Sequence, residues 1–226
     1  MSLVLYDLCG RDRSLRFSPY CWRIKLALAI KQLPYVTVAT AFTEIPGAAG
    51  GASRTVPLIE DDGTLVSDSL EIALYLDRTY PDAPPLFAGE TGVAAARFVE
   101  AWAYLTLHPI IMRMIVASIH DTLAPSDQAY FRPDREAKLG SALEQFQTGV
   151  EANTEALRTA LEPLRRTLGR SQWLGGDEPM FVDCVPFGTL SWLNAINGRL
   201  PLAAEDPLRG WFDRCFDVYG RKAGAA

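Results

Sequence analysis

The sequence predicts an α/β domain followed by an all-helical domain. Short strand-like runs alternate with helical patterns up to about residue 80, and beyond that point the apolar residues recur only at helical spacing. A stretch rich in proline and small residues, 81–92, separates the two parts and is typical of a linker. We therefore expect domains at residues 1–80 and 93–226, joined by this linker.

The first half of the N-terminal part has the element order β-α-β. Strand-like runs occupy residues 3–6 and 35–39. The helix between them is expected to begin at Ser18-Pro19, because serine is a favoured N-cap and proline fits the first helical position. A strand that follows a helix in this way is expected to run parallel to the first strand.

The second half has the order β-β-α. A loop rich in glycine and alanine, 46–53, comes first. Strand-like runs at 56–59 and 65–66 flank the turn Asp61-Asp62-Gly63, which predicts a β-hairpin. Ser67-Asp68-Ser69 then offers N-cap oxygens to a helix.

The C-terminal part is predicted to be a helical bundle. Pro163 falls inside a helical stretch, 154–168, and predicts a bend or break there. The apolar residues at helical spacing that indicate the bundle include Phe98, Trp102, Leu105, Leu139, Leu143 and Phe146.

Three kinds of protein are not expected from this sequence: a nucleic-acid binder, a secreted protein and a membrane-spanning protein. The net charge of −5 provides no general basic surface, so a nucleic-acid partner is not expected. The N-terminus lacks the pattern of a secretory signal, which predicts a cytoplasmic protein. The most apolar segment, 93–119, contains Arg97, Glu100, His108 and Arg113, so we expect a buried helical region rather than a membrane span.

The four cysteines lie far apart in the sequence. No Cys-x-x-Cys pair is present and neither histidine has metal-ligand spacing to a cysteine, so no metal site is expected. In a chain of this size without an export signal, the default is four reduced, mostly structural thiols. Cys21 alone falls near the candidate site described next.

The first feature of that site is Ser18. A hydroxyl at a helix N-terminus lies beside unpaired backbone N–H groups and the positive end of the helix dipole, where an anion is stabilised best. Two interpretations are open at this point. Ser18 is either an ordinary N-cap, or it also donates a hydrogen bond to a bound thiolate.

Two further features lie in the same domain. A cis bond between Val56 and Pro57 would leave the backbone of Val56 as an unpaired strand edge, which binds an extended peptide; an ordinary trans proline is the alternative. Asp68 and Ser69 form either a simple capping cluster or a site for an amino acid head group, with the carboxylate on helix N–H groups and the Ser69 hydroxyl and the ammonium on Asp68. Together the features describe a cradle for a small acidic peptide that carries a thiol.

With these residues in view, the chain resembles the soluble glutathione transferases over nearly its whole length. The resemblance implies a thioredoxin-like N-terminal domain and an all-α C-terminal domain. It is carried by Ser18-Pro19-Tyr20-Cys21-Trp22-Arg23, Thr55-Val56-Pro57, Asp68-Ser69 with Ile72-Ala73-Leu74-Tyr75-Leu76, and Trp173-Leu174-Gly175-Gly176-Asp177 with Asp183. Within this superfamily the chain is most similar to bacterial β-aryl etherases and fungal etherase-like transferases, through Ser18 to Arg23, Gly50-Gly51, Asp206-Pro207-Leu208-Arg209-Gly210-Trp211 with Asp213-Arg214, and Phe216-Asp217-Val218-Tyr219.

The resemblance assigns roles to individual residues. It implies that Ser18 activates the sulfur of glutathione, that Val56 pairs with the cysteinyl backbone beside a cis-Pro57, and that Asp68 with Ser69 holds the γ-glutamyl end. Asp183 matches a structural acidic residue near the start of a buried helix.

Two positions depart from the family pattern. Many relatives place Lys or Arg directly before the Val-Pro step to meet the glycine carboxylate of glutathione. Here Thr55 stands at that position, and Arg54, one residue earlier, is the candidate third anchor. Met180 stands where a capping Ser or Thr usually precedes Asp183, so the capping box is incomplete.

The acceptor substrate is expected to be a hydrophobic electrophile, aromatic or an aryl ether. Tyr20, next to the thiolate position, and Trp102, on the first helix of the C-terminal domain, are candidates to stack on it; a core role is the alternative for each. Further possibilities are Met112, Met114 and Trp192, while His108 and His120 are not expected to be catalytic because the mechanism requires no base.

Three functions are therefore distinguished. The favoured one is a glutathione S-transferase in which glutathione is the co-substrate; in the etherase branch the acceptor is an aryl ether and a phenolate is the leaving group. The second is a glutathione-dependent thiol reductase that works through Cys21, and the third is a noncatalytic ligand-binding protein of the same fold. The resemblance also implies a homodimer.

Overall fold

The N-terminal part contains a four-stranded sheet in the order β2-β1-β3-β4. The structure is a computed structural model and describes residues 3–223. β1 pairs parallel with β2 and antiparallel with β3, and β3 forms a hairpin with β4, so the predicted β-α-β and hairpin units are confirmed. The strands are β1 (Leu3–Leu8), β2 (Val36–Thr40), β3 (Leu58–Asp61) and β4 (Thr64–Ser67).

The helices of this part begin close to where the sequence predicts. α1 (Pro19–Ile30) has Ser18 as its N-cap and proline in its first turn, and α2 (Ser69–Thr79) follows β4. The predicted 46–53 loop is wrong in part, because 3-10 turns, η1 (Phe42–Gly51), cover most of it. The Glu44 carboxylate accepts the N–H of Ala41 at 2.9 Å and so stabilises the first of these turns.

All the regular structure described after residue 88 is helical, so the predicted fold, a thioredoxin-like α/β part followed by an all-α part, is confirmed. The first of these helices begins at Gly89, inside the predicted linker. The elements are α3 (Gly89–Trp102), the π-helical turn η2 (Ala103–Leu107), α4 (His108–Thr122), α5 (Pro125–Leu139), α6 (Leu143–Phe146), α7 (Val150–Ala160), α8 (Glu162–Leu168), α9 (Phe181–Asn197) and α10 (Pro207–Ala223).

The break predicted by Pro163 is confirmed, because α7 ends at Ala160 and the proline lies in the first turn of α8. The residues at helical spacing over 139–146 are divided between α5 and α6, because Gly140 adopts a left-handed φ of 71° and ends α5.

Two of the residues that indicated this helical segment lie on its surface. Phe98 and Leu105 follow the helical period, yet they are 75% and 71% exposed. The buried side of the segment is formed by Ala96, Ala103 and Leu107. The period identified the helix without showing which of its faces is buried.

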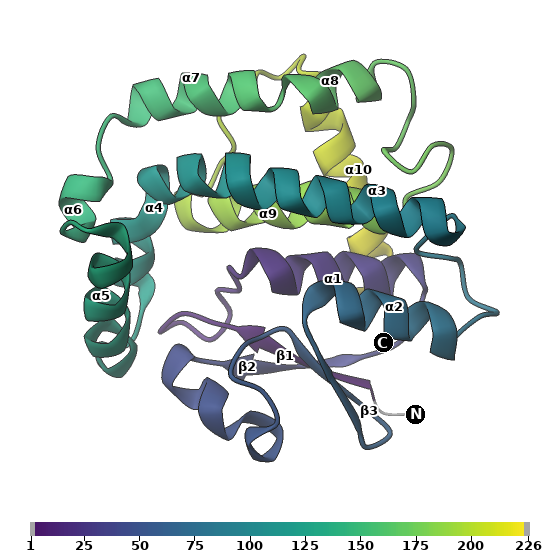
Figure 1. Cartoon of the computed structure of the whole chain (residues 1–226), viewed down its shortest axis with the longest axis horizontal. Coiled ribbons are helices and arrows are strands. Elements are labelled where there is room, and N and C mark those ends of the chain that lie inside the picture. The colour runs from purple at the N-terminus through teal and green to yellow at the C-terminus, as the bar shows by residue number, and fades with distance from the viewer. Residues whose placement is uncertain (1–2, 224–226) are drawn as a thin grey trace.

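The elements form successive layers (Figure 1). The sheet lies at one end, with α1 and α2 between it and the C-terminal helices; α3 and α9 form the next layer, and α7 and α8 lie on the far side. α1 packs most extensively against α9 and also contacts α10 and α2. Its side chains are almost entirely buried as a result.

Helical structure runs without interruption from Gly89 to Thr122 through α3, η2 and α4. By length and composition alone, these 34 residues are apolar enough to cross a membrane. In the fold they pack against α9 and α7, and they carry the charged residues Arg97, Glu100 and Arg113. This packing is that of the core helix of a folded protein, as the sequence predicts.

The contact between α1 and α9 depends on a glycine. A Cβ atom added to Gly188 would lie 2.2 Å from the carbonyl oxygen of Pro19 and 2.8 Å from Cγ of Arg23. Only a residue without a side chain lets α9 approach the first turns of α1 this closely. Gly188 therefore positions the N-terminus of α1, where Ser18 lies, against the C-terminal helices.

Candidate functional site

Ser18 occupies the N-cap of α1. Its backbone is extended, and its Oγ accepts the N–H of Cys21 at 3.2 Å, so the N-cap interpretation is confirmed. The side chain is buried, with 3% of its surface exposed. Because the hydroxyl oxygen accepts this bond, its hydrogen remains able to rotate toward another acceptor. That donor role stays a prediction.

Cys21 lies one turn further into the same helix. It is completely buried, and its Sγ lies 3.9 Å from the carbonyl oxygen of Tyr6. Burial, together with the charge of Asp7, raises the pKa of the Cys21 thiol far above its usual range, and the nearby Ser18 hydroxyl offsets only part of this rise. Since the thiolate is the reactive form, this environment favours a structural role for Cys21 over a catalytic one.

The other cysteines are also free and buried. They are Cys9, Cys184 and Cys215. Burial raises the pKa of each thiol, so none of them presents a thiolate near neutral pH.

The peptide bond between Val56 and Pro57 is cis. The two residues lie directly before β3, and no backbone hydrogen bond joins Val56 to another residue in the described range 3–223. Val56 is half-buried, while Arg54 and Thr55 are exposed. The backbone of Val56 is thus available to pair with an extended peptide.

Asp68 caps α2 with its own carboxylate. Its φ of 75° is left-handed, and its Oδ1 accepts the N–H groups of Leu70 at 2.9 Å and Glu71 at 3.2 Å. These bonds confirm the capping role of Asp68, while the binding of a ligand carboxylate at this helix N-terminus stays a prediction. The Ser69 hydroxyl is available to bind that carboxylate, because its Oγ accepts a bond from Arg23 at 3.3 Å and its hydrogen is free to donate.

Arg23 is the charged residue of the site that sequence reasoning missed. It is fully buried, and its Nη1 bonds both Ser69 and, at 2.5 Å, Glu100 of α3. The guanidinium also lies 4.6 Å from the centre of the Tyr20 ring. Burial lowers the pKa of Arg23 and the charge of Glu100 raises it. A charged side chain among the apolar residues of α1 was the signal available in the sequence, and α1 carries a second one, Lys25.

Four aromatic rings meet beside this arginine, and we call them the aromatic cluster: Tyr20, Tyr104, His108 and Trp192. His108 is the centre, with ring centroids 5.7 Å from Tyr20, 6.0 Å from Tyr104 and 5.4 Å from Trp192. The structure therefore groups Tyr20 and Trp192, both named from the sequence, with Tyr104, which the sequence did not single out, and with His108, which was not expected to be catalytic. Trp102 makes no ring contact with the cluster among the described residues.

Other predicted positions lie outside the cluster. Arg54 is exposed and forms no ion pair with any residue that the structure describes, so its role as an anchor stays a prediction. Met114 is buried in the core and Met112 packs against it. Asp183 accepts hydrogen bonds from the backbone N–H groups of Leu174, Gly175 and Met180 and from the Trp211 indole, which confirms its structural role.

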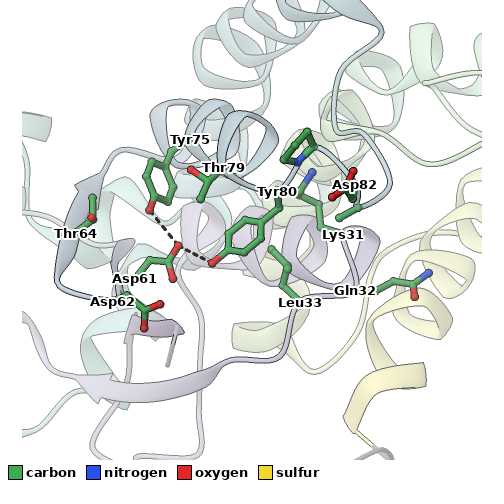
Figure 2. Close-up of a pocket in the computed structure, with 12 residues that line it drawn as sticks. Lys31, Gln32, Leu33, Asp61, Asp62, Thr64, Tyr75, Thr79, Tyr80 and Asp82 are labelled. Atoms are coloured by element: carbon green, nitrogen blue, oxygen red, sulfur yellow. Dashed lines mark hydrogen bonds between the residues drawn. The ribbon is translucent and has the colours of Figure 1, made fainter. Parts of the chain in front are cut away.

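A cavity of about 660 Å³ lies at the C-terminal end of α2, the end away from Asp68. Figure 2 shows Tyr75 and Tyr80 directed toward the same oxygen of Asp61, and the O–H···O distances are 3.0 and 2.7 Å. These hydroxyls are already engaged within the protein. Ser18, Val56 and Asp68 do not line this cavity, so it is not part of the candidate site.

Comparisons with known proteins identify the family and the fold. Residues 17–79 match the family model for the glutathione S-transferase N-terminal domain, and residues 94–209 match the model for the C-terminal domain. Among solved structures, glutathione transferase GSTFuA3 from Phanerochaete chrysosporium is 27% identical, with 97% of each chain covered and a TM-score of 0.84.

Two further structures are informative. The glutathione S-transferase CsGST83044 of Ceriporiopsis subvermispora, solved in complex with glutathione, is 25% identical, with 98% of this chain and 99% of that chain covered and a TM-score of 0.80. The β-etherase LigF from Sphingobium sp. strain SYK-6 is 17% identical, with 98% of this chain and 100% of that chain covered and a TM-score of 0.67. The likeness to LigF concerns the fold alone.

Proposed function

Because the chain belongs to the glutathione S-transferase family, we propose that it transfers glutathione to an electrophile and that the Ser18 hydroxyl activates the glutathione thiol. The observation that supports this most strongly is the position of Ser18. Its oxygen accepts the N–H of Cys21 at the helix N-terminus, and its hydrogen stays free to donate to an incoming sulfur.

The energetic requirement on Ser18 is modest. A free thiol has a pKa of about 8.5, so at neutral pH only about a few per cent is thiolate. Lowering that pKa by one unit requires about 1.4 kcal/mol of extra stabilisation of the anion. One hydrogen bond to the charged sulfur, together with the N-terminus of α1, supplies an effect of this size.

The remaining groups would hold the peptide. The free backbone of Val56 beside Pro57 would pair with the cysteinyl unit of glutathione, and Asp68 with Ser69 would bind the γ-glutamyl end. Asp68 is exposed, so its second carboxylate oxygen is accessible to an ammonium group. Arg54, also exposed, would meet the glycine carboxylate.

The acceptor is proposed to be a hydrophobic electrophile with an aromatic ring. The aromatic cluster supports this, because Tyr20 lies two residues from Ser18 and faces rings contributed by the C-terminal helices. With an aryl ether as substrate, the thiolate attacks the carbon that bears the aryloxy group; the C–S bond forms, the C–O bond breaks and the electron pair leaves on the phenolate. No external oxidant or reductant is needed for this step.

A matched pair of variants tests the proposal. Ser18→Ala removes the hydroxyl, and we expect kcat/KM for thioether formation with chlorodinitrobenzene to fall at least about tenfold, the effect of losing one hydrogen bond to a charged group. Cys21→Ser, one turn away, should retain nearly full activity because the Cys21 thiol is buried and protonated. The reverse pattern would identify a thiol reductase. Glutathione binding without transfer to any of a broad panel of electrophiles would identify a ligand-binding protein.

We further propose that the protein is a cytoplasmic homodimer. Phe98 and Leu105 present a large apolar surface along α3 and η2, and no described element of the chain covers it. A second copy packed on this face would remove both side chains from water.

A further inference from the structure

The polar atoms of the aromatic cluster that have no partner in the protein indicate which groups of a ligand the cluster can bind. The hydroxyls of Tyr20 and Tyr104 and the indole N–H of Trp192 have no hydrogen-bond partner among residues 3–220, whose side chains the structure describes. None of them belongs to the fully buried unpaired atoms, so each reaches solvent. The cluster therefore offers three free donors on its aromatic rings, one of them on Tyr20, two residues after Ser18.

His108 differs from its neighbours because its ring nitrogens have distinct roles. Its Nε2 lies 3.1 Å from Oγ1 of Thr189, and the Thr189 hydroxyl lies 3.1 Å from the carbonyl oxygen of Val185. A carbonyl only accepts, so the single hydroxyl hydrogen of Thr189 points to Val185 and its oxygen accepts from Nε2–H. This hydrogen-bond network assigns the tautomer in which Nδ1 carries a lone pair.

The Nδ1 atom is left as an accessible acceptor. Within the described part of the chain it has no hydrogen-bond partner, and it is not sealed from solvent. The ring itself is 9% exposed and held between Tyr20, Tyr104 and Trp192. The π-helical turn η2, a feature that often occurs at functional sites, brings Tyr104 against it.

The ring is also neutral. Burial, and secondly the positive charge of Arg23, lower the pKa of His108 to about 3. A neutral imidazole with Nε2–H committed to Thr189 can only accept at Nδ1. Nδ1 can accept a hydrogen bond from a ligand O–H, whereas a methoxy group in the same place has no hydrogen to donate to it.

We propose that His108 determines substrate specificity by accepting a hydrogen bond from a phenolic hydroxyl, so that the site prefers aromatic acceptors with a free ring hydroxyl over their O-methyl ethers. The inference rests on the proposed function, since it concerns the same acceptor site. The hydrogen bond is made by Nδ1, with Thr189 as the positioning residue that fixes the tautomer.

The first test measures binding and requires no turnover. The dissociation constants of 4-cresol and 4-methylanisole are measured by calorimetry for the wild type, His108→Phe and His108→Asn. The wild-type ratio, methyl ether over phenol, should fall about tenfold in His108→Phe, as expected for one hydrogen bond. In His108→Asn the amide oxygen can replace Nδ1 as acceptor, so a large part of the preference should return. Equal ratios in the wild type and His108→Phe would overturn the inference.

The second test uses two aryl ether substrates that differ only in methylation of the ring hydroxyl. The inference predicts that His108→Phe reduces kcat/KM for the phenolic substrate much more than for its methyl ether. Thr189→Val removes the oxygen that fixes the proton on Nε2 of His108, so both tautomers become accessible. This variant should reduce the same preference in part. A wild type that transfers glutathione to no electrophile, yet shows the His108-dependent binding ratio, would refute the proposed function and leave this inference intact.

Discussion

The hydroxyl of Ser18 and the thiol of Cys21 lie one turn apart on the same helix, yet their environments separate their chemistry. Ser18 sits at the helix N-terminus, where backbone N–H groups and the dipole favour a negative charge. Cys21 lies deeper, against Tyr6 and near Asp7, where a negative charge on sulfur is disfavoured. At the residue scale, the position along one helix decides which group interacts with a bound thiolate.

His108 provides a pH-dependent test at this scale. Its folded-state pKa of about 3 lies below the ordinary value of 6.5, so in that interval the unfolded chain binds a proton that the folded chain does not. The free energy of unfolding should therefore decrease as the pH falls below 6.5, by up to about 1.4 kcal/mol per unit from this residue. The charged and titratable groups nearest to the ring are Arg23, Tyr20 and Tyr104, with Glu100 paired to Arg23.

The contribution of His108 is isolated by comparison with His108→Asn, which does not titrate. Urea unfolding at about pH 7.5 and about pH 5 gives the stability difference between the two proteins. This difference should shift against the wild type by roughly 2 kcal/mol at the lower pH. A difference that does not change with pH would mean that His108 protonates in the folded protein like an ordinary histidine.

At the scale of elements, the site depends on the contact between α1 and α9. Gly188→Ala places a methyl group where the carbonyl oxygen of Pro19 and Cγ of Arg23 now lie, so the two helices must separate. We expect a loss of about 1–3 kcal/mol in the free energy of unfolding. Transferase activity should fall as well, because Ser18 begins the displaced helix.

Gly220→Ala is the matched control for that variant. Gly220 lies in α10, and a Cβ added there meets no atom within 4 Å. Alanine in an open helical position is expected to leave stability unchanged or raise it slightly. If thermal unfolding shows equal stability for the two variants, the close approach of α9 to α1 is not the constraint described here.

Elements whose signals are local were predictable from the sequence. Ser18 with Pro19 defines the start of α1, Asp62 and Gly63 both adopt the positive φ angles of a two-residue hairpin turn, and Pro163 separates α7 from α8. Each of these depends on the backbone chemistry of a few neighbouring residues. The 3-10 turns of η1 escaped prediction because the glycines of this segment and Pro46 favour a loop over a helix.

At the scale of the whole molecule, the unpredicted features join distant parts of the chain. Arg23 bonds Glu100 across 77 positions, and His108 bonds Thr189 across 81. Nothing in the local sequence indicates such partners, since the fold brings them together. For the same reason the helical period of Phe98 and Leu105 could not show that their face points to solvent.

The proposed dimer is tested by charging that face. Phe98→Glu combined with Leu105→Glu should convert a wild-type dimer into a monomer, because carboxylates do not tolerate burial in an apolar interface. Val150→Glu, on exposed α7, is the control and should remain dimeric. The masses are measured by analytical ultracentrifugation. A monomeric wild type, or a dimer that survives both glutamates, would rule out this interface.

The central claim is that the Ser18 hydroxyl lowers the pKa of bound glutathione. The direct measurement is a pH titration of the ultraviolet absorbance of the thiolate, on glutathione bound to the wild type, Ser18→Ala and Cys21→Ser. The account predicts a bound thiol pKa at least about one unit below the free value of about 8.5 in the wild type and in Cys21→Ser, and a return toward that value in Ser18→Ala. A thiol pKa that is unchanged by Ser18→Ala would contradict the account.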